Sequence, residues 1–306
     1  MLILLPPSER KTPRRRGRAV RLHTLSFPEL TTAREHLLSA LADVSALEDA
    51  ASNLGLPPTL SREVAGNVSW RTAPAQRVDA LYSGVLYDAL GLATLPVGAR
   101  RRAASRLVVV SAAWGLLRLD DRVPAYRLSM GMTLSGVGPV AAYWREWLAP
   151  VLDSRAAGHL VVDCRSATYA SAWRPGRDVA PRTVAVRVLR DVAGSRSVVS
   201  HLAKHTRGLV ARHLVSRSGP DPTTPERLAA VLEERWSVEL GPPARDGQRK
   251  LDLVLSDGPG QGVVASAAAI ASSSDQSAVP ETSVVAPASS VTSPRTRSPS
   301  VSPPSS

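Results

Sequence analysis

The sequence predicts an α/β (α+β) protein in which a mixed central sheet is flanked by helices within a single compact domain. Short apolar runs typical of buried strands alternate with longer segments whose apolar residues recur at helical spacing. Of the 306 residues, 43% are hydrophobic, which suffices for a sizeable core. From about Pro259 onward Ser, Pro, Ala, Val and Thr dominate, so we place the domain at residues 1–256 and expect a disordered tail at 257–306.

The first half of the domain contains two predicted strands, residues 1–5 and 106–110. Between them, apolar periodicity predicts three helices, over residues 33–51, 61–68 and 77–90, the first with its apolar face at Leu37, Leu38, Leu41, Val44 and Leu47. Residues 11–21 are strongly basic and lack apolar periodicity, which predicts a loop or mobile arm. We interpret residues 54–58 as a plain connection between helices rather than a degenerate helix–hairpin–helix motif.

The second half continues the same alternation. Three more helices are predicted, over residues 138–152, 200–215 and 224–234. Thr224 and Pro225 stand where an N-cap and a first-turn proline are preferred. The predicted strands are residues 159–162 and 182–189, a returning hairpin strand at 196–199, and a terminal hairpin at 236–240 and 251–255.

The chain is strongly basic, with 38 Lys and Arg against 26 Asp and Glu and a net charge of +12. This balance favours a polyanionic partner, although only three of the cations are lysines, which also indicates an arginine-rich composition bias. The single cysteine, Cys164, excludes an internal disulfide, and its position after an apolar run predicts a small buried side chain.

No segment has the uninterrupted apolar length of a membrane span, and the apolar run at residues 1–5 is too short for a signal peptide. We therefore expect a cytoplasmic protein with no membrane partner.

A polar stretch after the strand at 106–110 predicts a ligand site, because α/β sheets bind ligands outside their strand ends. The expected pocket residues are Ser8, Tyr82, Ser111, Trp114, Gly115 and Tyr126. Paired carboxylates could perform acid–base chemistry there, and the candidates are Glu9, Asp120 and Asp163. With Arg127 for a phosphate, the pocket would suit a nucleobase or nucleotide-like ligand. No Ser-His-Asp order, P-loop or GxGxxG motif is present.

The predicted helix at 200–215 carries the strongest nucleic-acid signal. Lys204, Arg207 and Arg212 lie on it, and the first two are neighbours on one face with no carboxylate in the helix. Either DNA phosphates or plain solvent would face these cations. Further expected DNA- or anion-binding residues are Lys11, Arg118 and Arg127. We assign no metal site and no cofactor.

Several segments, taken in order, resemble the peroxide stress protein YaaA family. They are residues 1–9 (MLILLPPSE) with Lys11, 82–90 (YSGVLYDAL), 111–128 (SAAWGLLRLDDRVPAYRL), 143–144 (YW), 160–169 (LVVDCRSATY) and 200–212 (SHLAKHTRGLVAR). The resemblance covers about residues 1–256. It departs from the family pattern at Arg10, Leu119 and Cys164-Arg165, which affects the fine geometry of the pocket.

The resemblance implies a cytosolic protein with one mixed α/β fold that binds DNA and limits iron-dependent damage during peroxide stress. No reaction is attached to the family pattern. Our first hypothesis is therefore a DNA-binding protein of the oxidative stress response that grips phosphates, and we favour a non-enzymatic role. The alternative is an enzyme that acts on a nucleobase or nucleotide in the strand-end pocket.

Overall fold

The computed structural model describes residues 1–192 and 194–256. The chain divides into two units, Met1–Asp257 and Gly258–Ser306. The tail that we predict to be disordered lies outside the described residues, and the domain boundary at residue 256 stays a prediction.

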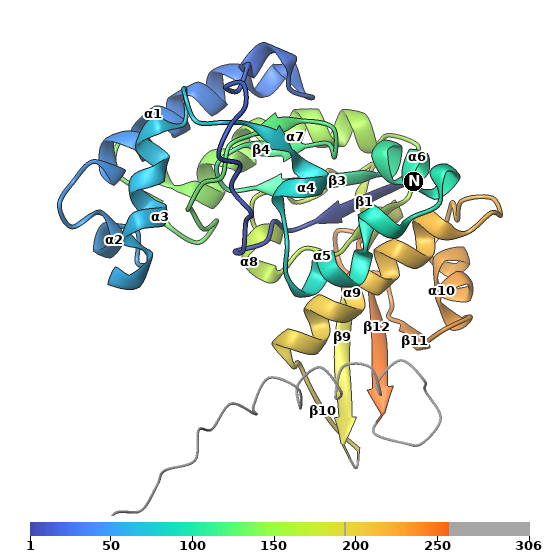
Figure 1. Cartoon of the computed structure of the whole chain (residues 1–306). Coiled ribbons are helices and arrows are strands. Elements are labelled where there is room, and N and C mark those ends of the chain that lie inside the picture. Colours follow the sequence, from blue (N-terminus) through green and yellow to red (C-terminus); the bar gives the residue numbers. More distant parts are fainter. Residues whose placement is uncertain (193, 257–306) are drawn as a thin grey trace, which may run out of the picture. The chain divides into compact units, whose positions relative to one another are not determined.

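A mixed eight-stranded sheet forms the centre of the first unit (Figure 1), which confirms the predicted fold class. Its strand order is β11-β12-β9-β8-β1-β3-β4, with β10 paired to β9. The five strands from β12 to β3 in this order run parallel, whereas β4, β10 and β11 run antiparallel to their neighbours. The strands of this sheet are β1 Leu2–Leu5, β3 Leu107–Ser111, β4 Gly115–Leu117, β8 Val161–Asp163, β9 Thr183–Val192, β10 Ser195–Ser197, β11 Ser237–Leu240 and β12 Arg249–Ser256.

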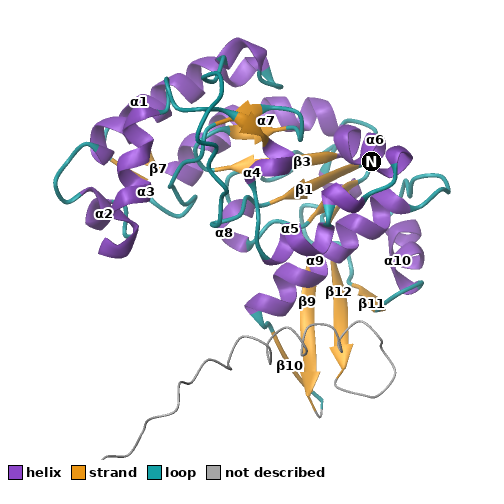
Figure 2. Cartoon of the chain, viewed as in Figure 1, coloured by secondary structure: helices purple, strands orange, loops and turns teal. Residues whose placement is uncertain are grey.

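Two small antiparallel pairs lie outside this sheet, and helices lie on both sides of the strands (Figure 2). The pairs are β2 Gln76–Arg77 with β5 Arg122–Val123, and β6 Thr133–Leu134 with β7 Gly138–Pro139. The α-helices are α1 Thr31–Ser45, α2 Ala50–Asn53, α3 Ser61–Ala65, α4 Val78–Leu81, α5 Val85–Leu90, α6 Val97–Arg106, α7 Val140–Ala156, α8 Ala167–Ala170, α9 Ser200–Ser216 and α10 Pro225–Glu233. Six short 3-10 helices join them, at Leu22–Thr24, Pro28–Leu30, Pro58–Leu60, Gly66–Ser69, Leu92–Thr94 and Ala180–Arg182.

Most of the long elements are predicted correctly, but the helix α6, Val97–Arg106, and the strand β4, Gly115–Leu117, are missed, and further errors occur at breaks. The predicted helix at 77–90 is two short helices, because the chain turns at Gly84, whose φ is 95°. The helix predicted at 33–51 ends at Ser45, so Leu47 is 53% exposed instead of packed. Residues 11–21 form an irregular segment as predicted, but backbone hydrogen bonds attach it to the domain, so it is not a free arm.

The side chain of Arg34 connects α1 to the hairpin of β3 and β4. It is fully buried and donates hydrogen bonds to the carbonyl oxygens of Trp114 (3.0 Å), Leu116 (2.7 Å) and Ser26 (2.8 Å). Burial lowers the pKa of Arg34 to about 10, partly offset by Asp121. A charged residue within an amphipathic helix is ordinarily exposed, so the sequence carried no signal for this contact.

Gly115 at the start of β4 gives a direct test of this packing. Its φ is +68°, and a Cβ atom there would lie 2.7 Å from Cζ3 of Trp144. We expect Gly115→Ala to lower the free energy of unfolding by about 2–4 kcal/mol, because it adds steric overlap to left-handed strain. Gly136→Ala is the matched control, since Gly136 has a φ of +78° but no atom within 4 Å, and should cost only about 1–2 kcal/mol. Urea denaturation measures both, and equal losses would contradict the steric argument.

Candidate functional site

The carboxyl ends of β1, β3 and β8 meet at one edge of the sheet, because these strands are parallel neighbours with β1 in the middle. After β1 the chain next enters this sheet at β3 on one side, whereas β8 is followed by β9 on the other side. Ligands of open α/β sheets bind at such a switch point. The loop that follows β1, residues 6–11, occupies this position (Figure 1).

Three hydroxyl groups form a hydrogen-bonded chain at this edge. The Ser111 hydroxyl donates to the Tyr126 hydroxyl (2.8 Å), and the hydroxyls of Tyr126 and Tyr82 share a hydrogen bond of 3.0 Å. Burial raises the pKa of Tyr82 to about 12 and that of Tyr126 well above its ordinary value. Both phenols therefore keep their protons at neutral pH, and because one O–H is used in the bond between them, the other remains available as a hydrogen-bond donor.

Lys11 packs its amine against these tyrosines. Its Nζ atom lies 4.2 Å from the centre of the Tyr126 ring and 5.8 Å from that of Tyr82, and it donates to the Ser8 carbonyl oxygen at 2.9 Å. Burial lowers the pKa of Lys11 to about 8, against the opposing effect of Glu9. A lysine with this pKa exchanges its proton close to neutral pH.

Arg127 closes the other side of the site. It donates to the Glu9 carbonyl oxygen (2.8 Å) and forms ion pairs with the carboxylates of Glu9 (3.3 Å) and Glu63 (3.6 Å). Two hydrogen bonds between the Asn67 side chain and the Arg127 backbone hold it in place. Within the described residues, the buried Arg127 Nε has no hydrogen-bond partner. Asn67 carried no sequence signal, because it lies in a segment predicted as plain helix.

This arrangement combines two cations, the two exposed carboxylates of Glu9 and Glu63, and two tyrosine rings around the loop after β1. Lys11 and Arg127 can attract an anionic group, and the Lys11 amine can hold or release a proton. Tyr82, Ser111 and Tyr126 thus lie together, and Ser8 is connected to them through Lys11, whereas their role as a ligand pocket stays a prediction. Across residues 1–192 and 194–256, no group of three or more His, Cys, Asp and Glu side chains is arranged to hold a metal ion.

Asp163 is not a free carboxylate, which corrects its place among the catalytic candidates. It accepts two hydrogen bonds from the Arg165 guanidinium, at 2.8 and 2.7 Å, and both side chains are almost fully buried. Arg165 also donates to the carbonyl oxygens of Tyr169 and Trp173. The pair therefore fixes the turn after β8 and leaves no carboxylate oxygen pointing to a substrate. Cys164 beside it is buried as predicted, and burial raises its pKa to about 12.

Asp120 and Arg118 also lie outside the site. The exposed Asp120 carboxylate pairs with Arg77, which is also bound by Asp79. Arg118 donates to the carbonyl oxygens of Ser105 (2.7 Å) and Leu107 (3.4 Å), so the protein itself occupies its guanidinium. Both expectations are corrected, because the β3–β4 hairpin turns these side chains away from the strand ends.

Trp114 and Gly115 belong to the core beneath the site rather than to its surface. Trp114 is fully buried and packs edge to face against Trp70. Gly115 admits the Trp144 ring, as described above. Their part in the expected pocket is therefore structural support.

Helix α9 does not present a row of free cations, which corrects the expectation for this helix. Arg207 donates to the Val186 carbonyl oxygen, and Arg212 donates to the carbonyl oxygens at the end of α5, 2.9 Å from each. A Cβ atom on Gly208 would lie 2.2 Å from the Leu86 carbonyl oxygen, so α9 packs directly on α5. Of the three predicted contacts, Lys204 alone is exposed.

A sequence model of the family described as peroxide stress protein YaaA matches residues 1–239. The chain belongs to this family. A UPF0246 protein of Streptomyces coelicolor is 46% identical over 261 residues, which cover 84% of this chain and 99% of that protein. A UPF0246 protein of Corynebacterium efficiens is 40% identical over 234 residues, covering 76% and 91%. Membership in this family supports a role in peroxide stress. No described helix has the length and apolar character needed to cross a membrane.

The buried ion pair of Asp163 and Arg165 in the turn after β8 can be tested by substitution. Asp163→Asn leaves the Arg165 charge buried without its partner, so we expect the free energy of unfolding to fall by about 3–5 kcal/mol. Asp120→Asn should change it by less than about 1 kcal/mol, because the Asp120–Arg77 pair is exposed. Urea denaturation of both variants distinguishes the two carboxylates, and a small loss for Asp163→Asn would return it to the catalytic candidates.

The unusual lysine can be titrated directly, because the chain contains only three lysines. After reductive ¹³C-methylation, the NMR resonance that is missing in Lys11→Arg belongs to Lys11. We expect this resonance to titrate with a midpoint near pH 8, because burial disfavours the charged amine. A midpoint near the ordinary lysine value would show that water reaches the amine and that the pocket is open.

Proposed function

We propose that the chain is a DNA-binding protein of the peroxide stress response that holds duplex phosphates with residues 10–21, the basic segment. This segment contains seven cations and no carboxylate. The observation that carries the proposal is that its arginines are unpaired. Within the described residues, no ion pair or hydrogen bond engages the side chains of Arg10, Arg14, Arg15, Arg16, Arg18 or Arg21.

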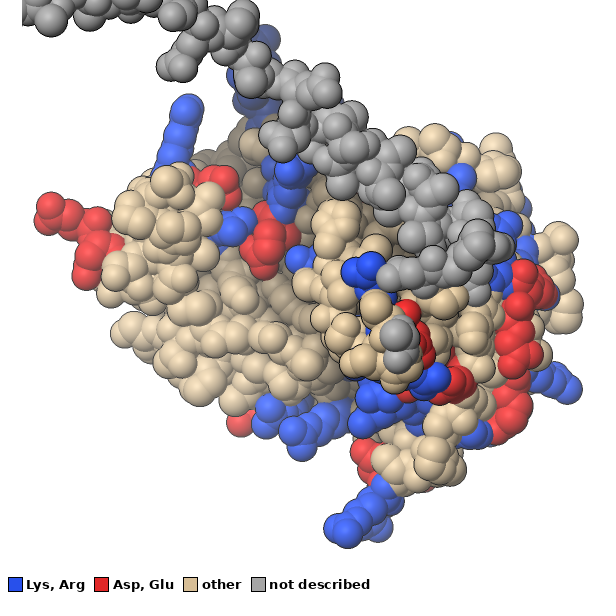
Figure 3. Space-filling view, turned by 90° about the horizontal axis from the view of Figure 1, so that it is seen from below, with Lys and Arg blue, Asp and Glu red and all other residues tan. Residues whose placement is uncertain are grey.

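The surface around β9, β10 and β12 supports this choice by contrast. The face in Figure 3 carries basic and acidic side chains close to one another. Around β9, β10 and β12, Arg187 pairs with Asp252, and Arg196 pairs with both Glu239 and Asp191. Cations neutralised in this way release few counterions when a polyanion approaches, so they contribute little to DNA affinity.

The basic segment is also held in place. Thr12 N donates to the Leu81 carbonyl oxygen and Ala75 N to that of Arg18, both at 2.9 Å. Lys11 pairs with Tyr82 in an isolated bridge, and the Gln76 amide donates to the Thr12 carbonyl oxygen. A segment ordered before binding loses less conformational entropy on contact with DNA than a mobile arm does.

Phosphate contacts also offer a route to limiting iron-dependent damage. DNA phosphates attract cations, and a protein that neutralises them with arginine releases those cations. Iron(II) held at phosphates would be released in the same way, so oxidants would form further from the DNA. The proposal places the chain in the cytoplasm, where bacterial DNA lies.

A second candidate function is an enzyme that acts on a nucleobase or nucleotide in the strand-end pocket. The observation that favours it is the buried Lys11 amine next to the partnerless Nε of Arg127. The Lys11 resonance described above reports on this candidate as well, because a nucleotide bound there would shift it.

Replacing Arg15 and Arg16 with Gln tests the DNA proposal. We expect binding to unrelated duplexes to weaken alike, because phosphate contacts carry no sequence information. The slope of log K against log salt should flatten by up to about 1.8, some 0.9 for each lost contact. Fluorescence anisotropy of labelled duplexes over a salt titration measures both quantities.

The matched control replaces Arg196 and Arg217 with Gln. It removes the same formal charge, but both arginines are ion-paired with glutamates. We expect its salt slope to stay within about 0.5 of the unmodified chain. Equal effects in the two double variants would mean that net charge, not the basic segment, drives binding.

A further inference from the structure

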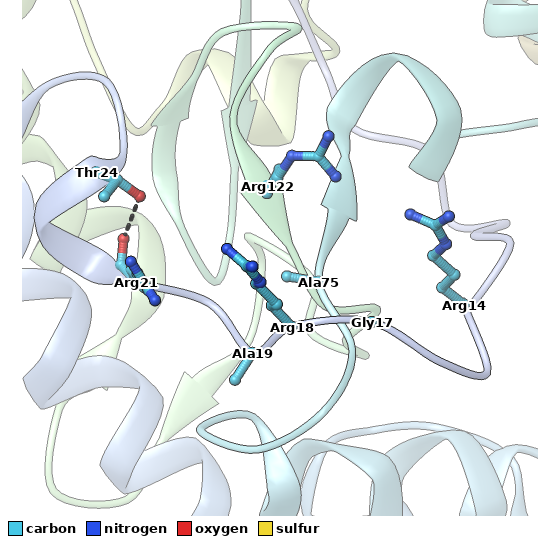
Figure 4. A pocket seen from close by; sticks show the side chains of 8 residues that line it. All are labelled: Arg14, Gly17, Arg18, Ala19, Arg21, Thr24, Ala75 and Arg122. Atoms are coloured by element: carbon cyan, nitrogen blue, oxygen red, sulfur yellow. Dashed lines mark hydrogen bonds between the residues drawn. The ribbon is translucent and has the colours of Figure 1, made fainter.

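A concave site lies beside the basic segment, and none of the strand-end residues Ser8, Lys11, Tyr82, Ser111, Tyr126 and Arg127 lines it. Its cavity measures about 460 Å³. The residues that line it are Arg14, Gly17, Arg18, Ala19, Arg21, Thr24, Ala75 and Arg122. In Figure 4, the side chains of Arg14, Arg18 and Arg122 extend to one side of the chain around Gly17.

The charge in this cavity is unbalanced. Four of its eight lining residues are arginines and none is acidic. The two carboxylates next to Arg122 in sequence are engaged elsewhere. Asp120 pairs with Arg77, and Asp121 accepts hydrogen bonds from the backbone amides of Ser26 (2.7 Å) and Arg118 (2.8 Å). Within the described residues, no carboxylate lies at ion-pair distance from any of the four arginines.

Backbone contacts bring the segments that carry these arginines to one cavity. Arg122 lies on β5, which pairs with β2, and the Ala75 amide just before β2 donates to the Arg18 carbonyl oxygen. At the other end, the hydroxyl and the amide of Thr24 both donate to the Arg21 carbonyl oxygen, at 2.8 and 3.0 Å. The backbone segments of Arg18 and Arg122 are thus attached to one frame, and the exposed side chains of the four arginines offer positive charge to an anion at this place.

The number of cations indicates the class of anion. A backbone phosphodiester carries one negative charge, whereas pyrophosphate and triphosphate groups carry several close together. Guanidinium groups bind phosphate oxygens through paired hydrogen bonds, so four arginines can balance the several negative charges of a pyrophosphate or triphosphate group. The cavity volume is in the range of small-ligand sites. Its lining contains no aromatic side chain to stack on a base, so recognition would rest on the phosphates alone.

We infer that the cavity lined by Arg14, Arg18, Arg21 and Arg122 is a binding site for a pyrophosphate- or triphosphate-type anion. The anion is either the phosphate chain of a nucleoside triphosphate or an inorganic polyphosphate. This site goes beyond the proposed DNA-binding function and does not depend on it.

Isothermal titration of the full chain with sodium pyrophosphate, sodium triphosphate and ATP tests the inference. We expect saturable binding at one site, with triphosphate tighter than orthophosphate or sulfate. Replacing Arg18 and Arg122 with Gln should weaken triphosphate binding at least tenfold. Arg18→Gln alone provides a milder variant if the double variant does not fold, and should weaken binding at least threefold.

The control is the Arg15 and Arg16 double replacement, which removes two charges from the same segment but none from the cavity lining. Its triphosphate affinity should change less than twofold. A preference for ATP or for triphosphate would support the site and identify the carrier of the phosphate chain, and equal affinity would support recognition of the phosphate chain alone. Absence of saturable binding, or equal losses in the control and in the Arg18 and Arg122 variant, would overturn it. Because the DNA test uses Arg15 and Arg16, the two proposals fail separately.

Discussion

Backbone pairing of β1 with both β3 and β8 is the constraint on which the rest of the fold depends. This strand has only four residues, and all of them are buried. Buried amide and carbonyl groups need partners, so a strand this short must be paired on both sides. Ile3 lies opposite Leu107 on one side and Val162 on the other. This register brings three strand ends together and determines where the loop after β1 leaves the sheet.

The loop after β1 and the basic segment that continues from it place their cations in opposite environments. Lys11 turns inward onto the tyrosines, where burial lowers its pKa, while the arginines that follow it stay exposed. Lysine can lose its proton at moderate cost, whereas arginine keeps its charge, so the two residue types suit the two regions. The inward region fits proton chemistry or small-ligand binding, and the outward region fits attraction of polyanions.

Arginine also serves as a structural donor throughout this protein. Arg34, Arg165 and Arg212 all direct their guanidinium groups to backbone carbonyl oxygens. One guanidinium offers five donors in a planar fork, so it can satisfy several carbonyls that lie at the ends of different elements. The formal charge of the chain therefore overstates the charge offered to a partner, and contacts must be inspected residue by residue.

The sequence by itself determined the fold class, most of the long helices and strands, and the family, although it missed α6. These features follow from apolar periodicity and from the order of motifs, which local composition encodes. Only the tertiary structure decided which charged side chains are free. Arg207 and Asp163 look available in the sequence, yet Arg207 donates to the Val186 carbonyl oxygen and Asp163 pairs with Arg165. The carboxylates that precede Arg122 in the sequence bind other partners, so Arg122 lines the cavity together with arginines of the basic segment. Such pairing depends on distances between residues far apart in the chain, and a linear pattern does not contain those distances.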